Sequence, residues 1–219
     1  MTEADDRSLG MRIEYVDVLA PPTFEPTGVV KSVVEAVEAG DWLGVMNIWL
    51  VRPNGSLLYQ QRPDGGWEPG KFDGSVGGYY RAGESGLDGL REAREELGWS
   101  CPPEEIALLG RHLSVGVDSR GRERRLVVTV YMTACDVPLE DFVLDQKEVP
   151  ALYEIAADDV IAAFQSPGRQ LTARGIDCAG QPLERRASAE DFSYVFGGYH
   201  LKIAQIAKKY AHGERRFYY

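Results

Sequence analysis

The sequence is poor in cysteine and histidine and has no long apolar run. Three of its 219 residues are cysteine and three are histidine. Cys101, Cys135 and Cys178 are odd in number and form no C-x-x-C pair, which argues against a disulfide scaffold and a zinc knuckle. The longest strongly apolar stretch, Leu126–Cys135, is shorter than the roughly 20 residues that a helix needs to cross a bilayer. We therefore expect no association with membranes.

Basic residues are also scarce. The chain has 24 lysines and arginines against 34 acidic residues, which gives a formal charge of −10. Because binding to a phosphate backbone requires a basic face, this balance argues against general nucleic-acid binding. Met1–Gly10 is polar and acidic, and it lacks the positive charge and the apolar run of a secretory signal. These features predict a cytoplasmic protein.

What the sequence does contain is typical of a folded protein. Hydrophobic residues make up 44% of the chain, which excludes wholesale disorder. The length fits one domain with additions, or at most two domains. We divide the chain into an N-terminal extension that packs on the core (1–40), a central domain (41–165) and a C-terminal loop and helix extension (166–219).

Apolar and β-branched segments separated by turn residues predict several strands. Pro53–Ser56 contains an Asn-Gly turn between two such segments and predicts a hairpin. Together with the helical patterns below, the strands indicate a mixed α/β layer fold. The expected strands are Ile13–Leu19, Met46–Val51, Leu57–Gln61, Leu126–Cys135 and Val149–Ile155.

Helical spacing predicts helices at Gly86–Leu97, Ala156–Phe164 and Tyr199–Tyr210, and Gly98 is expected to end the first of them. Ser188-x-x-Asp191 is a capping signal for the last helix. Val29–Ala39 fits either a short helix or an extended segment. Gly168–Arg186 is expected to be a loop, and the segments Arg62–Asp73 and Arg111–Arg125 are further loop candidates.

The most informative stretch is a glycine-rich segment followed by an acidic helix. At 100° per residue, Glu92, Glu95 and Glu96 fall within an arc of about 100°. Carboxylates this close repel one another unless cations lie among them, and clustered oxygen ligands suit Mg²⁺ or Mn²⁺ rather than zinc. Arg91 can pair with Glu95 one turn later. The alternative is an ordinary solvated helix face that carries several charges.

These residues resemble the Nudix box, whose pattern is Gly, five residues, Glu, seven residues, then Arg-Glu-U-x-Glu-Glu-x-Gly-U, where U is a bulky aliphatic residue. The chain departs from the pattern in having six residues between Glu84 and Arg91, and in carrying Ala93 and Trp99 at two U positions. The matching residues are Gly78, Glu84, Arg91, Glu92, Glu95, Glu96 and Gly98.

The resemblance extends beyond the box, over about Gly40–Phe164, where the chain resembles the Nudix subgroup related to isopentenyl-diphosphate isomerase. It implies a Nudix-type α/β/α sandwich with a mixed β-sheet, here with a C-terminal helical extension. The isomerase itself needs a cysteine and histidines at and before the glycine-rich segment, where this chain has Gly77 and Tyr79 and no upstream histidine. Without those groups the isomerase reaction has no evident proton donor or acceptor, so we reject it.

The resemblance instead implies a hydrolase that uses Mg²⁺ or Mn²⁺ and water to cut a small-molecule organic diphosphate, such as a nucleoside diphosphate linked to another moiety. Either Glu95 or Glu148 would act as the general base, and Arg91 would orient a glutamate. For Glu148 the alternative is a solvated loop acid. Gly78, Glu84 and Gly98 would support the motif. The implied metal ligands are Glu92, Glu96, Glu95 and the carbonyl of Gly77.

Residues outside the box remain open to two interpretations. Arg62, Tyr79 and Arg124 are candidate substrate contacts, although Tyr79 can simply pack on the sheet and Arg124 can simply be solvated. Arg215–Tyr219 can form a docking tail or a homodimer contact. The alternative for the whole chain is a non-catalytic Nudix-fold module that binds nucleotides or regulates a partner.

Overall fold

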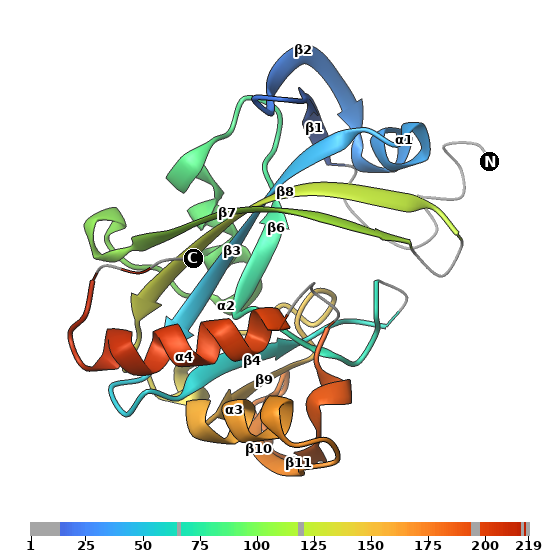
Figure 1. Cartoon of the computed structure of the whole chain (residues 1–219). Helices are drawn as coiled ribbons and strands as arrows, with labels where there is room; N and C mark the ends of the chain where they lie inside the picture. Colours follow the sequence, from blue (N-terminus) through green and yellow to red (C-terminus); the bar gives the residue numbers. More distant parts are fainter. Residues whose placement is uncertain (1–13, 65–66, 118–120, 194–197, 216, 218–219) are drawn as a thin grey trace.

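The computed structural model of the chain describes residues 14–64, 67–117, 121–193, 198–215 and 217 (Figure 1). The predicted polar segment Met1–Gly10 and residues 216, 218 and 219 of the C-terminal end lie outside the described residues. The helices are α1 (Val33–Ala39), α2 (Arg91–Leu97), α3 (Ala157–Gln165) and α4 (Tyr199–Ala211). The strands are β1 (Tyr15–Ala20), β2 (Glu25–Ser32), β3 (Trp42–Val51), β4 (Leu57–Gln61), β5 (Phe72–Asp73), β6 (Val76–Tyr79), β7 (Ala107–Val117), β8 (Glu123–Ala134), β9 (Ala151–Ile155), β10 (Leu171–Asp177) and β11 (Pro182–Ala187).

The strands form one mixed sheet that branches at β3. On one side β3 runs parallel to β8, and β8 pairs antiparallel with β7. Along its other side β3 meets three strands in succession: β1 at Trp42 and Leu43, β6 from Val45 to Ile48, and β4 at Val51. One branch continues from β1 to β2, and the other runs β4–β9–β10–β11. Figure 1 shows the two branches diverging above and below β3.

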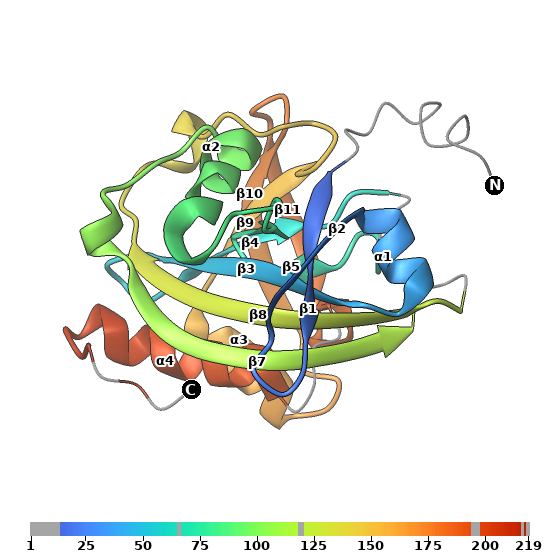
Figure 2. The same cartoon turned by 90° about the horizontal axis from the view of Figure 1, so that it is seen from above.

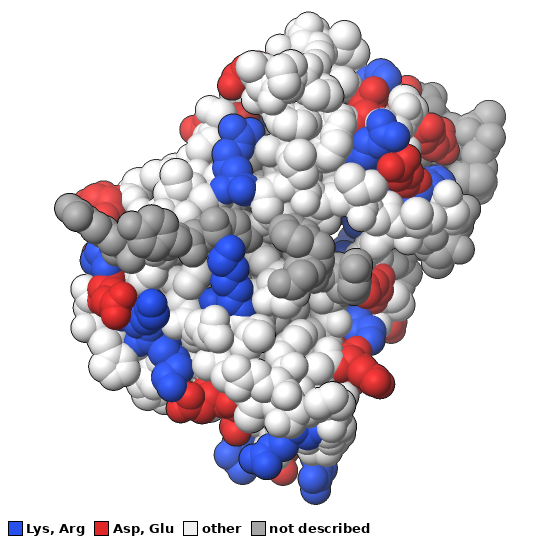
Figure 3. Space-filling view, viewed as in Figure 1, with Lys and Arg blue, Asp and Glu red and all other residues white. Residues whose placement is uncertain are grey.

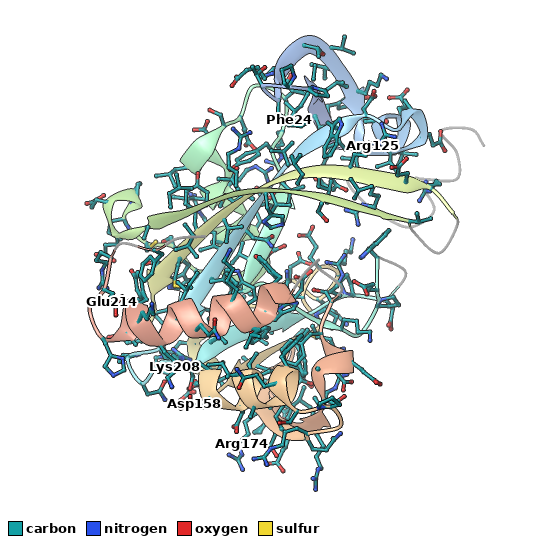
Figure 4. The ribbon with its side chains drawn as sticks, viewed as in Figure 1. Phe24, Arg125, Asp158, Arg174, Lys208 and Glu214 are labelled. Atoms are coloured by element: carbon teal, nitrogen blue, oxygen red, sulfur yellow. The ribbon has the colours of Figure 1, made fainter. Side chains whose placement is uncertain are left out.

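Helices cover both faces of the sheet, as the view from above shows (Figure 2). Because side chains alternate along a strand, β3 contributes to two cores. Met46 and Ile48 pack with Leu97 of α2, whereas Trp49 packs with Tyr59 and the side chains of α3 and α4. An ion pair between Lys208 of α4 and Asp158 of α3 joins the two helices at the surface (2.5 Å; Figure 4).

Two local predictions are confirmed in detail. The hairpin β3–β4 turns at the Asn-Gly pair, and Gly55 has the positive φ of +85° that such a turn requires. Helix α2 ends at Gly98, whose φ is +62°. The N–H of Gly98 donates to the carbonyl of Arg94, as in the αL type of helix C-cap, and that of Trp99 to the carbonyl of Ala93, both at 3.1 Å.

The prediction of a loop at Gly168–Arg186 is wrong, because this segment forms β10 and β11. β10 pairs with β9 and so joins the main sheet, while β11 pairs with β10 as the last strand of this branch. The sequence shows no clear strand pattern here, because β11 is largely exposed and carries charged residues and because β10 contains Gly175. A Cβ at that glycine would lie 2.1 Å from the carbonyl oxygen of Leu152.

Arg111–Arg125 is likewise not simply a loop, because it forms much of β7 and the start of β8. The predicted helix Gly86–Leu97 divides into a 3₁₀ segment, Gly86–Leu90, and α2. Val29–Ala39 contains both alternatives, since the end of β2 is followed directly by α1, which Ser32 caps.

The capping signal at Ser188 and Asp191 is present but belongs to a different element from the predicted one. It begins a 3₁₀ turn, Ala189–Asp191, whereas α4 begins after Gly198, which has a φ of +77°. The predicted apolar stripe of α4 is otherwise present, with Ile203, Ile206 and Tyr210 buried. Among the described residues, no helix is both long and apolar enough to cross a bilayer.

Candidate functional site

Three carboxylates from two segments meet beside α2. Glu92 and Glu96 project from one side of the helix, and Glu148 comes from the segment before β9. One carboxylate oxygen from each lies within 4.8 Å of the others. Glu92 and Glu96 are 5% and 4% exposed, whereas Glu148 is open to solvent. We refer to these three residues as the carboxylate trio. Three oxygen donors at this separation fit a Mg²⁺ or Mn²⁺ ion.

The end of α2 itself holds the segment that carries Glu148. The N–H of Asp145 donates to the carbonyl of Glu96 (2.8 Å), and the N–H of Val143 donates to that of Leu97 (3.0 Å). The last carbonyls of a helix lack partners within the helix, so these bonds satisfy two of them. The N–H of Val149 then bonds the carbonyl of Asp145 at 2.8 Å. Glu148 is thereby fixed relative to the helix that bears the other two carboxylates.

The glycines of β6 allow the acidic helix to approach the sheet closely. The N–H of Gly77 donates to Oε2 of Glu96 at 3.2 Å. At Gly78 an added Cβ would lie 2.3 Å from Oε1 of Glu92 and 2.5 Å from its Cδ. No ordinary contact is that short, so the carboxylate of Glu92 occupies the space that any other residue at position 78 would fill. This contact explains why the motif has glycine at this position.

Arg91 contacts several other residues of the motif. Its Nε and Nη2 bind the two carboxylate oxygens of Glu84 at 2.7 and 3.1 Å, and its Nη1 lies 2.6 Å from Oε1 of Glu92. Nη2 also donates to the carbonyl of Tyr79 at 3.0 Å. Burial raises the pKa of Glu84, but its hydrogen bonds from Arg91 and from the N–H of Arg81 outweigh this and lower it. Despite the six-residue spacing, Glu84 reaches Arg91 in a bidentate pair.

The electrostatics of the trio favour a bound cation. Burial raises the pKa of Glu92 to about 7, against the opposing effect of Arg91. Burial and the charge of Glu92 hold the pKa of Glu96 well above its usual range. The pKa of Glu148 is also raised, first because its carboxylate is partly shielded from water and then by the charge of Asp145. Because a divalent ion offsets repulsion of this kind, the donor set fits such an ion both in chemistry and in charge.

Glu95 stands apart from the trio. Its side chain is 39% exposed, and its Oε2 lies 2.8 Å from Nη2 of Arg81 and 3.5 Å from Nη1 of Arg91. Nε of Arg81 also lies 3.4 Å from Oε1 of Glu14. Sequence reasoning missed Glu14, because it meets Arg81 only through contacts between segments far apart in the chain, such as the hydrogen bond from the N–H of Ala82 to the carbonyl of Tyr15 (2.8 Å). Helical periodicity likewise could not show that Arg81 would hold Glu95 in an ion pair.

The three candidate substrate contacts behave differently. Arg62 binds the carboxylate of Asp73 and the carbonyl of Trp67, and therefore supports its own loop. Nη2 of Arg124 donates to the hydroxyl of Tyr79 at 2.5 Å, and its Cζ lies 5.0 Å from the centre of the Trp67 ring. The structure thus brings Tyr79 and Arg124 together and adds Trp67, which the sequence analysis did not single out.

The chain is similar to known proteins in sequence and in fold. The NUDIX domain family matches residues 42–174. An uncharacterized Nudix hydrolase of Clostridium acetobutylicum is 31% identical over 139 residues, which are 59% of this chain and 65% of that protein. The chain therefore matches slightly less than two thirds of this relative's length.

Among solved structures, the DR0079 protein of Deinococcus radiodurans has 20% sequence identity and a TM-score of 0.53, with coverage of 70% of this chain and 90% of that one. A MutT/nudix family protein of Enterococcus faecalis has 20% identity and a TM-score of 0.43, with coverage of 62% and 51%. The first of these supports the predicted α/β sandwich, and the family match covers more than half of the chain. The chain belongs to the NUDIX domain family.

Proposed function

We propose that the protein is a Mg²⁺-dependent hydrolase of an organic diphosphate. The observation that carries this proposal is the carboxylate trio, in which Glu92, Glu96 and Glu148 lie within 4.8 Å of one another and two are buried. Buried anions this close are costly unless a cation joins them. Membership of the NUDIX domain family and the description of the Clostridium acetobutylicum relative as a Nudix hydrolase support the same reaction class.

The trio would hold a divalent ion, with the carbonyl of Gly77 as a further candidate ligand. Such an ion neutralises diphosphate oxygens and lowers the pKa of a bound water. The chain's own groups then position the reactants. Arg91 orients the carboxylate of Glu92 through the 2.6 Å contact. Glu148, the exposed member of the trio, is our candidate general base, because it can accept a proton from the attacking water and release it to solvent.

Glu95, the other candidate base, is held by Arg81 at 2.8 Å. We propose that it contributes negative charge at the rim of the site and holds Arg81 in place. A Glu95→Gln variant should therefore lose less activity than a Glu148→Gln variant when both are assayed at saturating Mg²⁺. The reverse order would assign the base to Glu95.

The decisive experiment measures hydrolysis and metal binding together. The protein is incubated with nucleoside diphosphates, dinucleotides, sugar nucleotides and alkyl diphosphates, with and without Mg²⁺, while calorimetry measures Mn²⁺ binding. Glu96→Gln should abolish both turnover and Mn²⁺ binding. Glu104→Gln, which changes an exposed carboxylate outside the trio, should leave both unchanged. Full turnover in Glu96→Gln, or no Mn²⁺ binding to the unaltered protein, would refute the proposal.

The same experiment tests the alternative that the chain is a non-catalytic module. That alternative requires ligand binding with no turnover in any condition. The bidentate Glu84–Arg91 pair weighs against it, because the shortened box still assembles the contact that orients Glu92.

A further inference from the structure

The segment that leads from β6 toward the acidic helix, Tyr80–Ser85, is held by the first strand of the chain. We call this segment the entry loop. Figure 1 shows the chain rising from β6 to the level of β1 and β2 before it returns to α2. The N–H of Ala82 donates to the carbonyl of Tyr15 at 2.8 Å, and the N–H of Gly83 donates to Oδ2 of Asp17 at 2.7 Å. Two successive backbone donors of the entry loop therefore find their acceptors on β1.

Inside the entry loop, Glu84 makes two further bonds. Its N–H donates to the carbonyl of Arg81 at 2.8 Å, and its Oε2 accepts the N–H of Arg81, also at 2.8 Å. Between these two residues Gly83 has a φ of +85°, so the chain reverses at the point where Asp17 binds it. Because the carboxylate of Glu84 also pairs with Arg91, the position of this turn determines where the loop meets the helix.

β1 is itself docked on the core, so it can act as a support. Val16 and Val18, on one side of the strand, are buried. Val16 packs with Val37 of α1, and Val18 pairs with Leu43 of β3. Because side chains alternate along a strand, Asp17 projects from the opposite side, where the entry loop lies. The family match begins at residue 42, so this support comes from a part of the chain outside the match.

A second contact runs from the start of β1 to the acidic helix. Oε1 of Glu14 lies 3.4 Å from Nε of Arg81, whose Nη2 lies 2.8 Å from Oε2 of Glu95. The same oxygen of Glu14 lies 4.0 Å from Nη1 of Arg91. Figure 3 shows a largely uncharged surface over β2, at the top of the view, whereas Glu14 and Asp17 bind residues of the entry loop. The β1 segment is thus connected with α2 by two routes.

We propose that Asp17 is a positioning residue of the hydrolase. By accepting the N–H of Gly83, it fixes the turn that presents Glu84 to Arg91. Arg91 in turn holds the carboxylate of Glu92 in the trio. Without this acceptor the turn is free to shift outward, and the bidentate contact between Glu84 and Arg91 loosens. Asp17 acts through these groups rather than on the reactants. This inference rests on the proposed function, since it assigns Asp17 a role in the same site.

The first test follows the site without substrate or metal. NMR records the Nε–H signal of Arg91, which donates to Glu84 at 2.7 Å, and the hydrogen exchange of the Gly83 amide. Arg91→Lys identifies the arginine signal by its loss. Asp17→Ala should speed exchange at Gly83 and shift the Arg91 signal toward that of a solvated arginine. Asp17→Asn should leave both close to those of the unaltered protein, because its amide oxygen still accepts a hydrogen bond. An unchanged Arg91 signal in Asp17→Ala would overturn the inference.

The second test measures hydrolysis at saturating Mg²⁺, with the diphosphate that the unaltered enzyme hydrolyses fastest and each variant kept well below its melting temperature. Asp17→Ala should lower kcat by about 10-fold and leave KM within about twofold. This is less than the roughly 100-fold cost of a 1 Å misplacement, because the bonds between Glu84 and Arg81 remain. Asp17→Asn should restore most of the loss.

The matched control is Asp41→Ala. It removes another ion pair of the N-terminal part of the chain, that of Asp41 with Lys31 at 2.6 Å, which does not involve the entry loop. Asp41→Ala should leave kcat unchanged. Equal losses of kcat in Asp17→Ala and Asp41→Ala would show only a general effect of docking this part of the chain. Either that result or an unchanged kcat in Asp17→Ala would refute the positioning role.

The two proposals fail in different ways. If no diphosphate were turned over but Asp17→Ala still shifted the Arg91 signal, the hydrolase would be refuted, while the structural link from β1 to α2 would be supported. Turnover that requires Mg²⁺ and is lost in Glu96→Gln, but is insensitive to Asp17→Ala, would leave the hydrolase standing and remove the role of Asp17.

Discussion

Replacing Gly78 by alanine should damage the carboxylate trio while leaving the fold intact. The added Cβ would lie 2.3 Å from Oε1 and 2.5 Å from Cδ of Glu92, whereas ordinary contacts begin near 3.4 Å. The carboxylate of Glu92 must therefore move by about 1 Å, and the move also breaks its 2.6 Å contact with Arg91. A misplacement of about 1 Å in a reacting group can cost roughly 100-fold in rate, or about 2.7 kcal/mol of activation free energy.

The assay compares Gly78→Ala with Gly74→Ala, a matched control four residues earlier. At position 74 the added Cβ would meet Asn47 at 3.6 Å and Trp49 at 3.7 Å, which are ordinary contacts. We expect Gly78→Ala to lose about 100-fold in kcat and to bind Mn²⁺ more weakly, while the melting temperatures of both variants stay close to that of the unaltered protein. If Gly78→Ala kept full activity, or lost it only by unfolding, the steric argument would be wrong.

Three further predictions concern single groups. Arg91→Lys should lower kcat by about 10- to 100-fold with little change in KM, because lysine cannot form the two-point contact with Glu84; a normal pH–rate profile and kcat would contradict this. Glu96→Gln should raise the melting temperature in EDTA, since folding no longer has to protonate this carboxyl or bury its charge, but Mg²⁺ should no longer stabilise the protein. His200 has a pKa lowered by burial to about 4, so the folded state disfavours its protonation and stability is lost as pH falls from about 6.5. Between pH 7.5 and 4.5 the difference in unfolding free energy between His200→Gln and the unaltered protein, measured with urea, should therefore change by about 2–3 kcal/mol in favour of the variant, and a difference that stays constant with pH would disprove the shift.

The sequence predicted those elements whose local pattern and tertiary environment agree. The hairpin β3–β4 has an Asn-Gly turn between apolar strands, and α2 ends at a glycine that adopts the left-handed conformation. The sequence did not predict β10 or β11. β10 needs Gly175 where it passes Leu152, and β11 is largely exposed. There the pairing of neighbouring strands decides the structure, and no alternation of apolar residues reports it.

The sequence predicted which residues form the candidate site better than it predicted how they are arranged. Spacing on one helix identified Glu92 and Glu96 and made Glu95 look equivalent to them. In the structure, Arg81 from a separate segment binds Glu95, while Glu148 joins the other two. The cluster of Trp67, Tyr79 and Arg124 draws on a loop and two strands. Contacts of this kind depend on packing between segments far apart in the chain, and the spacing of residues within one helix or strand does not reveal them.

The hydrogen bonds from Val143 and Asp145 to the last carbonyls of α2 have a consequence for how this site can be altered. They attach the loop that bears Glu148 to the acidic helix as well as to the strand that follows. Transplanting the helix alone into another scaffold would leave one of the three oxygens behind. A successful graft would have to carry residues 91–98 and 143–148 together, as one cassette.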